Sequence, residues 1–191
     1  MTPAARRCDA MNAIMTSLLA RFVRDRRGVS AVEFAMLLPL MIALYLGGVE
    51  ISQGVAIDRK VTLMARTVAD LTAQVATVYN ADMTNILNAS AAIMQPYSTA
   101  DLKITVSSVV VDANGLATIA WSDTKGGTAR AVGAAVTLPA ALAVPGTSLI
   151  WGETSYAYKP TIGYVVTGTL NLSDQMFMRP RLSDQVTRAT T

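Results

Sequence analysis

Residues 26–49 have the sequence RRGVSAVEFAMLLPLMIALYLGGV, and this order of residues sets the architecture of the chain. The part from Phe34 to Val49 contains no charged residue, and Glu33 and Glu50 lie at its two ends. A helix that crosses a bilayer needs about 20 apolar residues, with a lower limit near ~17. The stretch reaches this length when its flanks are included, so we predict a transmembrane helix over residues 29–57.

The net charge of +3 is unevenly distributed along the 191 residues. Residues 1–28 carry six arginines against two aspartates, a net charge of +4, whereas the remainder carries ten basic and eleven acidic residues, a net charge of −1. Basic residues on one side of an apolar helix favour the cytoplasm for that side. The N-terminus is therefore expected in the cytoplasm and the C-terminal remainder outside it. Four residues are assigned to this topology: Arg21, Arg24, Arg26 and Arg27.

A secretory signal peptide is an alternative explanation of a basic start followed by an apolar run. Such a peptide requires a small-residue cleavage site after the apolar region. Here the run is followed by GGVEISQGVAIDRKV, which has no A-x-A pattern and continues the helical periodicity. An exported soluble protein thus stays a weaker alternative.

The composition excludes several classes of chemistry. The chain has no histidine and one cysteine, Cys8, so it lacks a Ser-His-Asp triad and a thiolate zinc site. Asp112 and Asp123 are expected in turns, and Trp121, Trp151, Tyr156 and Tyr158 are expected to pack in the core. The later basic residues are scattered among acids, unlike a nucleic-acid-binding stripe. We therefore predict no enzymatic activity, no metal or other cofactor and no nucleic-acid partner.

The junction before the apolar run is Arg26-Arg27-Gly28-Val29-Ser30-Ala31-Val32-Glu33-Phe34. This pattern resembles a type IV prepilin cleavage site, which implies that a prepilin peptidase cuts between Gly28 and Val29 and removes residues 1–28 as a basic cytoplasmic leader. Glycine allows the backbone to extend into a protease cleft. A carboxylate such as Glu33 is costly in lipid, and the free amino group of Val29 in a neighbouring copy is a partner that would set the stagger between subunits. Alternatively, Glu33 lies at the interface and interacts favourably with the helix dipole.

A wider motif narrows the family. Residues 25–35 (DRRGVSAVEFA), followed by Leu38-Pro39, resemble the TadE-like pseudopilins of the tight-adherence (Flp-type IVb) pilus system. A looser similarity covers Tyr156–Pro160 and Met178–Arg181. The resemblance implies a minor pseudopilin, anchored in the bacterial inner membrane, whose partners are the peptidase, other pilins or pseudopilins, Tad assembly components and the lipid bilayer. It also assigns subunit assembly to Glu33 and Phe34.

The pattern of the remaining sequence predicts an α+β fold. One helix is expected from near Ser30 to about Val78, bent at Pro39, and its spacings of three and four form an apolar seam that packs either on another copy or on the chain's own domain: Val61, Met64, Val68, Leu71, Val75 and Val78. A second short helix is expected over residues 81–94. Strands are expected over residues 102–111, 116–122, 147–159 and 170–179, with a hairpin turn at residues 112–115; residues 129–146 are unassigned. This long helix, short helix and small antiparallel sheet resemble pilin-like proteins.

We therefore expect four segments: a leader (1–28), a transmembrane and assembly helix (29–57), a helical stalk (58–95) and a β-rich periplasmic or extracellular domain (96–191). Two functions are compatible with them. The first is a processed minor pseudopilin that takes part in assembly of a tight-adherence pilus. The second is an uncleaved, single-pass envelope binding module or adhesin, in which the arginines serve only as a topology determinant.

Overall fold

Helix α2 runs from Arg27 to Ala73 and contributes residues to both units into which the chain divides, Met1–Gly48 and Val49–Thr191. The computed structural model describes residues 16, 21, 27–160 and 168–190. The first unit is described mainly as helix, whereas the second contains one further helix and all the strands of the described residues. The predicted α+β fold, with a long helix, a short helix and an antiparallel sheet, is confirmed.

The remaining elements follow in the order short strand, helix, sheet strands and C-terminal strand. After α2 come β1 (Thr77–Val78), α3 (Asn80–Ala92), β2 (Leu102–Val111), β3 (Ala117–Lys125), β4 (Ala135–Val136), β5 (Ser148–Tyr158), β6 (Leu170–Met178) and β7 (Thr187–Arg188). The four longer strands and the second helix lie where β-branched composition and helical periodicity predict them, with ends that differ by up to three residues.

The principal sheet is antiparallel and has the strand order β4-β3-β2-β5-β6. Its central pairing joins β2 to β5, with Val106 opposite Gly152, and β6 forms one edge, with Leu170 opposite Tyr158. A register shift between Ser108 and Val109 interrupts the β2–β3 pairing. The pairing of β2 with β5 joins residues that are far apart in sequence, such as Val106 and Gly152.

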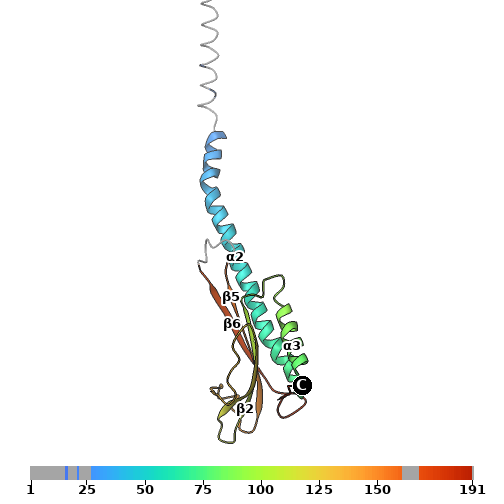
Figure 1. Ribbon diagram of the computed structural model, residues 1–191. Helices are drawn as coiled ribbons and strands as arrows, with labels where there is room; N and C mark the ends of the chain where they lie inside the picture. The colour runs from blue at the N-terminus through green and yellow to red at the C-terminus, as the bar shows by residue number, and fades with distance from the viewer. Residues whose placement is uncertain (1–15, 17–20, 22–26, 161–167, 191) are drawn as a thin grey trace, which may run out of the picture. The chain divides into compact units, whose positions relative to one another are not determined.

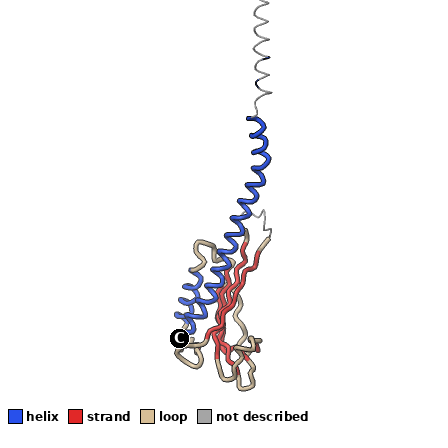
Figure 2. The backbone as a smooth tube through the Cα atoms, turned by 180° about the vertical axis from the view of Figure 1, so that it is seen from behind, coloured by secondary structure: helices blue, strands red, loops and turns tan. Residues whose placement is uncertain are grey.

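One face of this sheet is covered by the two helices of the second unit. In Figures 1 and 2 the C-terminal part of α2 and all of α3 lie on the same side of the strands. The predicted apolar seam is buried there: Val61, Met64 and Val68 of α2 are fully buried. Leu71 of α2 and Val75, just after the helix, are partly buried against the same core. The seam therefore packs on the chain's own domain, which resolves the two alternatives left open by its spacing.

The opposite face of the sheet carries a smaller core. Val109, Ile119 and Leu149 are at most 1% exposed and pack with Trp151, while Leu138 from the segment after β4 covers them. Residues 129–146, which the sequence left unassigned, supply this cover and the short strand β4. All four aromatic residues predicted to be core residues are less than 9% exposed, so that prediction is confirmed.

Helix α2 ends five residues before the predicted position at Val78. Thr77 and Val78 form β1 and pair in parallel with Thr187 and Arg188 of β7. The carbonyl oxygen of Ala73 accepts a hydrogen bond of 2.9 Å from the backbone N–H of Arg181. A segment more than 100 residues away therefore donates to a carbonyl group whose hydrogen bond would otherwise continue the helix. The local spacing of apolar residues does not predict this interaction.

The hairpin turn between β2 and β3 lies where the sequence predicts it. The Oδ1 atom of Asp112 accepts hydrogen bonds from the backbone N–H groups of Asn114 and Leu116, at 2.8 and 2.7 Å. Gly115 has φ of 82°, a conformation that glycine adopts without strain. The hydrogen bond from Leu116, followed by those from the other turn residues, lowers the pKa of the exposed Asp112 carboxyl.

Candidate functional site

The junction predicted to be a cleavage site occupies the first residues of α2. Gly28, Val29, Glu33 and Phe34 are all exposed, and the exposed fraction of Val29 and of Phe34 is 58%. A Cβ atom added at Gly28 would meet nothing within 4 Å. Val29 and Glu33 are four residues apart and therefore lie on the same face of the helix, one turn apart. No packing among the described residues requires glycine at position 28, and its assignment to a cleavage site stays a prediction.

The arginines predicted to set the topology are only partly described. Arg21 is exposed, and Arg27 is the first residue of α2. Arg24 and Arg26 lie outside the described residues, so the grouping of the four positive charges stays a prediction.

Helix α2 continues through Pro39. Because proline has no N–H to donate, the carbonyl of Ala35 loses its helical partner, and the predicted bend at this point stays a prediction.

The N-terminal half of α2 has an apolar surface on all sides. None of its most apolar 18-residue window is buried, and the helix is long and apolar enough to cross a membrane. Met36, Leu44 and Tyr45 have exposed fractions of 76%, 69% and 72%. A helix that is apolar all round is not stable in water by itself. This segment therefore requires a lipid or protein environment, and it can serve as a membrane anchor.

The C-terminal half of α2 is held on the sheet at a close approach of two backbones. A Cβ atom added to Gly152 would lie 2.6 Å from the carbonyl oxygen of Ala65, 2.9 Å from Val68 Cγ1 and 3.0 Å from Ala69 Cβ. Small residues on both surfaces, Gly152 on β5 and Ala65 and Ala69 on α2, therefore let the helix lie directly on the strand. This contact connects the helix to the β-domain.

A second contact between helix and sheet lies at the start of the second unit. Glu50 of α2 is 2% exposed, and the hydroxyl group of Tyr158 donates a hydrogen bond of 3.4 Å to Gln53 Oε1. Burial raises the pKa of the Tyr158 hydroxyl, and the charge of Glu50 adds to this shift. An open pocket of about 290 Å³ lies beside these residues, lined by Ile51, Val55, Leu170 and their neighbours.

The far face of the sheet carries a polar pocket of about 710 Å³. Arg130 crosses this face and donates two hydrogen bonds to Glu153, of 2.8 and 2.6 Å, and this pairing raises the pKa of the guanidinium. The guanidinium carbon of Arg130 lies 4.0 Å from the ring centroid of Trp151, which stacks on Phe177 with centroids 5.4 Å apart. These contacts fix the segment after β3 to the sheet.

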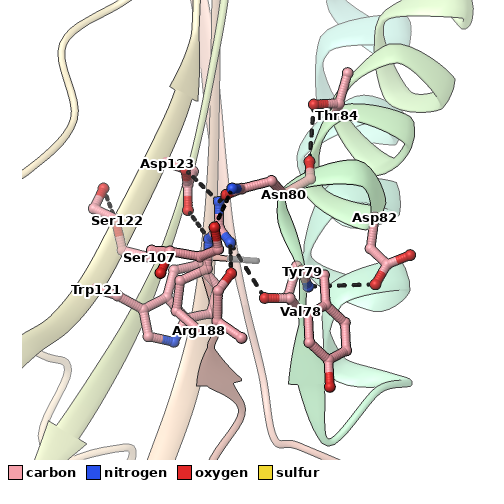
Figure 3. Close-up of polar contacts among 12 residues, drawn as sticks. Val78, Tyr79, Asn80, Asp82, Thr84, Ser107, Trp121, Ser122, Asp123 and Arg188 are labelled. Carbon is pink, nitrogen blue, oxygen red and sulfur yellow. Dashed lines mark hydrogen bonds and ion pairs between the residues drawn. The ribbon is translucent and has the colours of Figure 1, made fainter.

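A C-terminal clasp, made by residues 186–190, joins the start of α3 to β3 of the sheet (Figure 3). The guanidinium of Arg188 donates to Asp123 Oδ2 at 2.8 Å and to Asn80 Oδ1 at 2.7 Å. Trp121 Nε1 donates to the carbonyl of Val186 at 2.8 Å, and Asn80 Nδ2 donates to the carbonyl of Thr190 at 2.8 Å. Asp123 is a residue of β3 and pairs with Arg188, so its predicted position in a turn is wrong.

Sequence reasoning did not identify this clasp. Its contacts join positions 65 to 110 residues apart, and the residues involved are common ones with no characteristic spacing. Within the described ranges, no group of three or more His, Cys, Asp or Glu side chains is placed to hold a metal ion. Three ion pairs among the described residues, Arg130–Glu153, Arg181–Asp70 and Arg188–Asp123, connect parts of the domain to one another.

Comparison with known proteins finds a family match that covers most of α2, including most of the part that packs on the sheet. Residues 28–70 match the family described as TadE-like protein. No curated protein and no solved structure matches the chain. The matched segment begins at Gly28 and ends three residues before the end of α2, which confirms the resemblance found in the sequence.

Proposed function

We propose that the chain is a minor pseudopilin, processed by a prepilin peptidase between Gly28 and Val29. A TadE-like segment together with a helix able to span a membrane fits a membrane-anchored component of a tight-adherence pilus. The observation that carries the finer proposal is the position of the Arg-Arg-Gly junction and Glu33 at the head of an apolar surface that has no cover among the described residues.

In this function each segment has a separate task. Residues 1–28 are the leader removed on the cytoplasmic side, and residues 29–57 anchor the chain and pack against other pilins or pseudopilins. Cleavage leaves a free ammonium group on Val29, and Glu33 of a neighbouring copy is its partner. A charge pair in a medium of low dielectric constant is far stronger than in water, so this pair fixes the register of adjacent subunits. The folded domain lies on the periplasmic side.

The intact mass of the membrane-extracted protein tests the processing step. In cells with a prepilin peptidase we expect a chain that begins at Val29, and in cells without it the full 20.2 kDa chain. A chain that retains Gly28 and the preceding arginines in both strains would contradict processing. In that case, co-purification of the uncut chain with an envelope complex, in cells lacking other pilus parts, would support the alternative of a membrane-anchored binding module.

The topology has its own test. Protease added to spheroplasts should degrade the folded domain, because it is proposed to lie outside the inner membrane. Degradation only after the membrane is permeabilised would place the domain in the cytoplasm and contradict the assignment made from the arginines.

A further inference from the structure

The uncharged outer surface of α2 continues beyond the first unit. Glu50 is 2% exposed, so its charge is not displayed on the outer surface of the helix. Ile51 and Val55 follow it with exposed fractions of 57% and 48%. The next charged residues of the helix are Asp58 and Arg59, and both are exposed. The outward surface of α2 therefore carries no charge between Glu33 and Asp58.

The length of this surface can be compared with that of a bilayer. At 1.5 Å per residue, a helix crosses a hydrocarbon core of ~30 Å in about 20 residues. Counted from Phe34, the first residue after Glu33, such a span ends near Gln53. Ile51 and Val55 then lie at the boundary between acyl chains and headgroups, and Asp58 lies among the headgroups. This step rests on the membrane anchoring proposed above.

The strands of the second unit reach the same level of α2. Tyr158 contacts the helix at Gln53 and Gly54: its hydroxyl donates to Gln53 Oε1 at 3.4 Å, and its ring lies 3.9 Å from a Cβ built at Gly54. Leu170 is paired with Tyr158 at the edge of the sheet and has an exposed fraction of 39%. An apolar patch of Ile51, Val55 and Leu170 thus borders the open pocket of about 290 Å³ beside Tyr158, whose lining also includes Glu50 and Asp58.

We propose that this patch, defined as Ile51, Val55 and Leu170, contacts the lipid bilayer at its outer interface. Lipid is the occupant favoured by continuity, because Ile51 follows Gly48, the last residue of the apolar first unit, by three positions. Apolar side chains at the boundary of headgroups and acyl chains are removed from water without crossing the membrane. The contact gives the β-domain a second attachment point besides α2, which fixes its orientation on the membrane surface.

Single-cysteine labelling of the full chain in phosphatidylcholine vesicles tests the contact. Cys8 is the only cysteine, so Cys8→Ser provides the background for an environment-sensitive fluorophore placed by Leu170→Cys. Leu182→Cys is the matched control, because Leu182 is 70% exposed and follows Arg181, which binds the far end of α2 at Ala73. Nitroxide groups on the lipids quench a fluorophore that lies near them. Circular dichroism verifies that each variant is folded, and Val55→Cys is a second probe of the same patch.

The expected result is quenching at position 170 about twofold or more above that at position 182, because an interfacial apolar group lies ~5–10 Å into the boundary region. Quenching at position 170 that is no greater than at position 182, with Val55→Cys likewise quenched no more than position 182, would overturn the proposal. A fluorophore at 170 that is shielded from water but not quenched would also overturn it, and would indicate a second copy as the occupant. Leu40→Cys separates this failure from failure of the anchor: it should be quenched whenever α2 spans the bilayer, whatever the result at position 170.

Discussion

Gly152 of β5 lies against the backbone of Ala65 in α2, so closely that a Cβ atom at Gly152 would be 2.6 Å from the Ala65 carbonyl oxygen. The contact is formed between the TadE-like segment and the domain that follows it in sequence. It determines how near the helix approaches the sheet, and therefore how tightly the seam residues Val61, Met64 and Val68 are buried.

Gly152→Ala should destabilise the domain by about 1–3 kcal/mol, because the added methyl group meets backbone rather than a flexible side chain and forces the helix away from the sheet. The measurement is urea denaturation of the full chain in detergent, followed by tryptophan fluorescence.

The matched control is Gly54→Ala on the facing helix, where the new Cβ would lie at an ordinary contact distance of 3.9 Å from Tyr158. Alanine in a helix interior is more stable than glycine by ~0.5–1 kcal/mol. Equal effects of the two substitutions would contradict the close approach at Gly152.

Arg188→Ala should lower the free energy of unfolding by about 1.5–3 kcal/mol, since it removes hydrogen bonds made by a charged group to Asp123 and Asn80. The side chains of Arg188 and Asp123 are 17% and 28% exposed, so solvent screens this pair only in part. Arg181→Ala is the control, because the Arg181 side chain is 58% exposed in its pair with Asp70. An exposed pair contributes ~0–1 kcal/mol. If both variants lost the same stability in urea denaturation, the clasp would not be a stabilising feature.

Asp112 should make stability depend on pH at the acidic end. Its pKa in the folded chain is below the ordinary value of 3.8, so the ionised form stabilises the hairpin turn. The contribution is fully present above about pH 4 and is lost as the pH falls through the lowered folded pKa. Asp112→Asn keeps an acceptor oxygen for the turn but does not titrate. The difference in unfolding free energy between the original chain and Asp112→Asn should therefore shrink on acidification. A difference that is constant with pH would refute the assignment.

Gly28→Glu should block processing, because a long charged side chain at the scissile position obstructs entry of the backbone into the protease cleft. The expected product in membranes is a full-length chain, detected by intact mass. Gly48→Ala is the control: a Cβ atom there meets nothing within 4 Å, so this variant should be processed like the original chain. Normal cleavage of Gly28→Glu would place the processing site elsewhere.

Glu33→Ala should leave membrane insertion intact and weaken pilus assembly, since it removes the proposed partner of the Val29 ammonium group and not the apolar surface. The measurements are the amount of protein in membranes and the yield of sheared pili. Ser30→Ala, an exposed change one turn earlier in the same helix, should affect neither. Unchanged piliation in Glu33→Ala would exclude a role of this carboxylate in subunit register.

Local patterns predicted most of the elements in this chain. The spacing of Val61, Met64 and Val68 predicts a helix with one buried side, and the β-branched run of residues 102–111 predicts β2, which has these bounds. The turn at Asp112 is also predicted, because its hydrogen bonds join residues no more than four positions apart. In each case the determining interactions lie within one element or between sequence neighbours.

The junction at Gly28 is likewise a property of the sequence alone. Its proposed role rests on the order of arginine, glycine and glutamate before an apolar run, and the TadE-like match over residues 28–70 begins at its glycine. The tertiary structure adds that no contact within the described chain requires Gly28 or covers Val29 and Phe34.

The tertiary structure alone decided which surface the seam of α2 packs on, where that helix ends, and what holds the C-terminus. Whether the seam faces its own sheet or another copy depends on the approach allowed by Gly152, which is more than 80 residues from Ala65. The end of α2 at Ala73 involves Arg181, more than 100 residues away, and Asp123 is paired with Arg188, 65 residues away. The spacing of apolar residues predicts which residues are buried but not which residues they contact. Hydrogen bonds and close contacts between distant segments impose no regular spacing on the sequence.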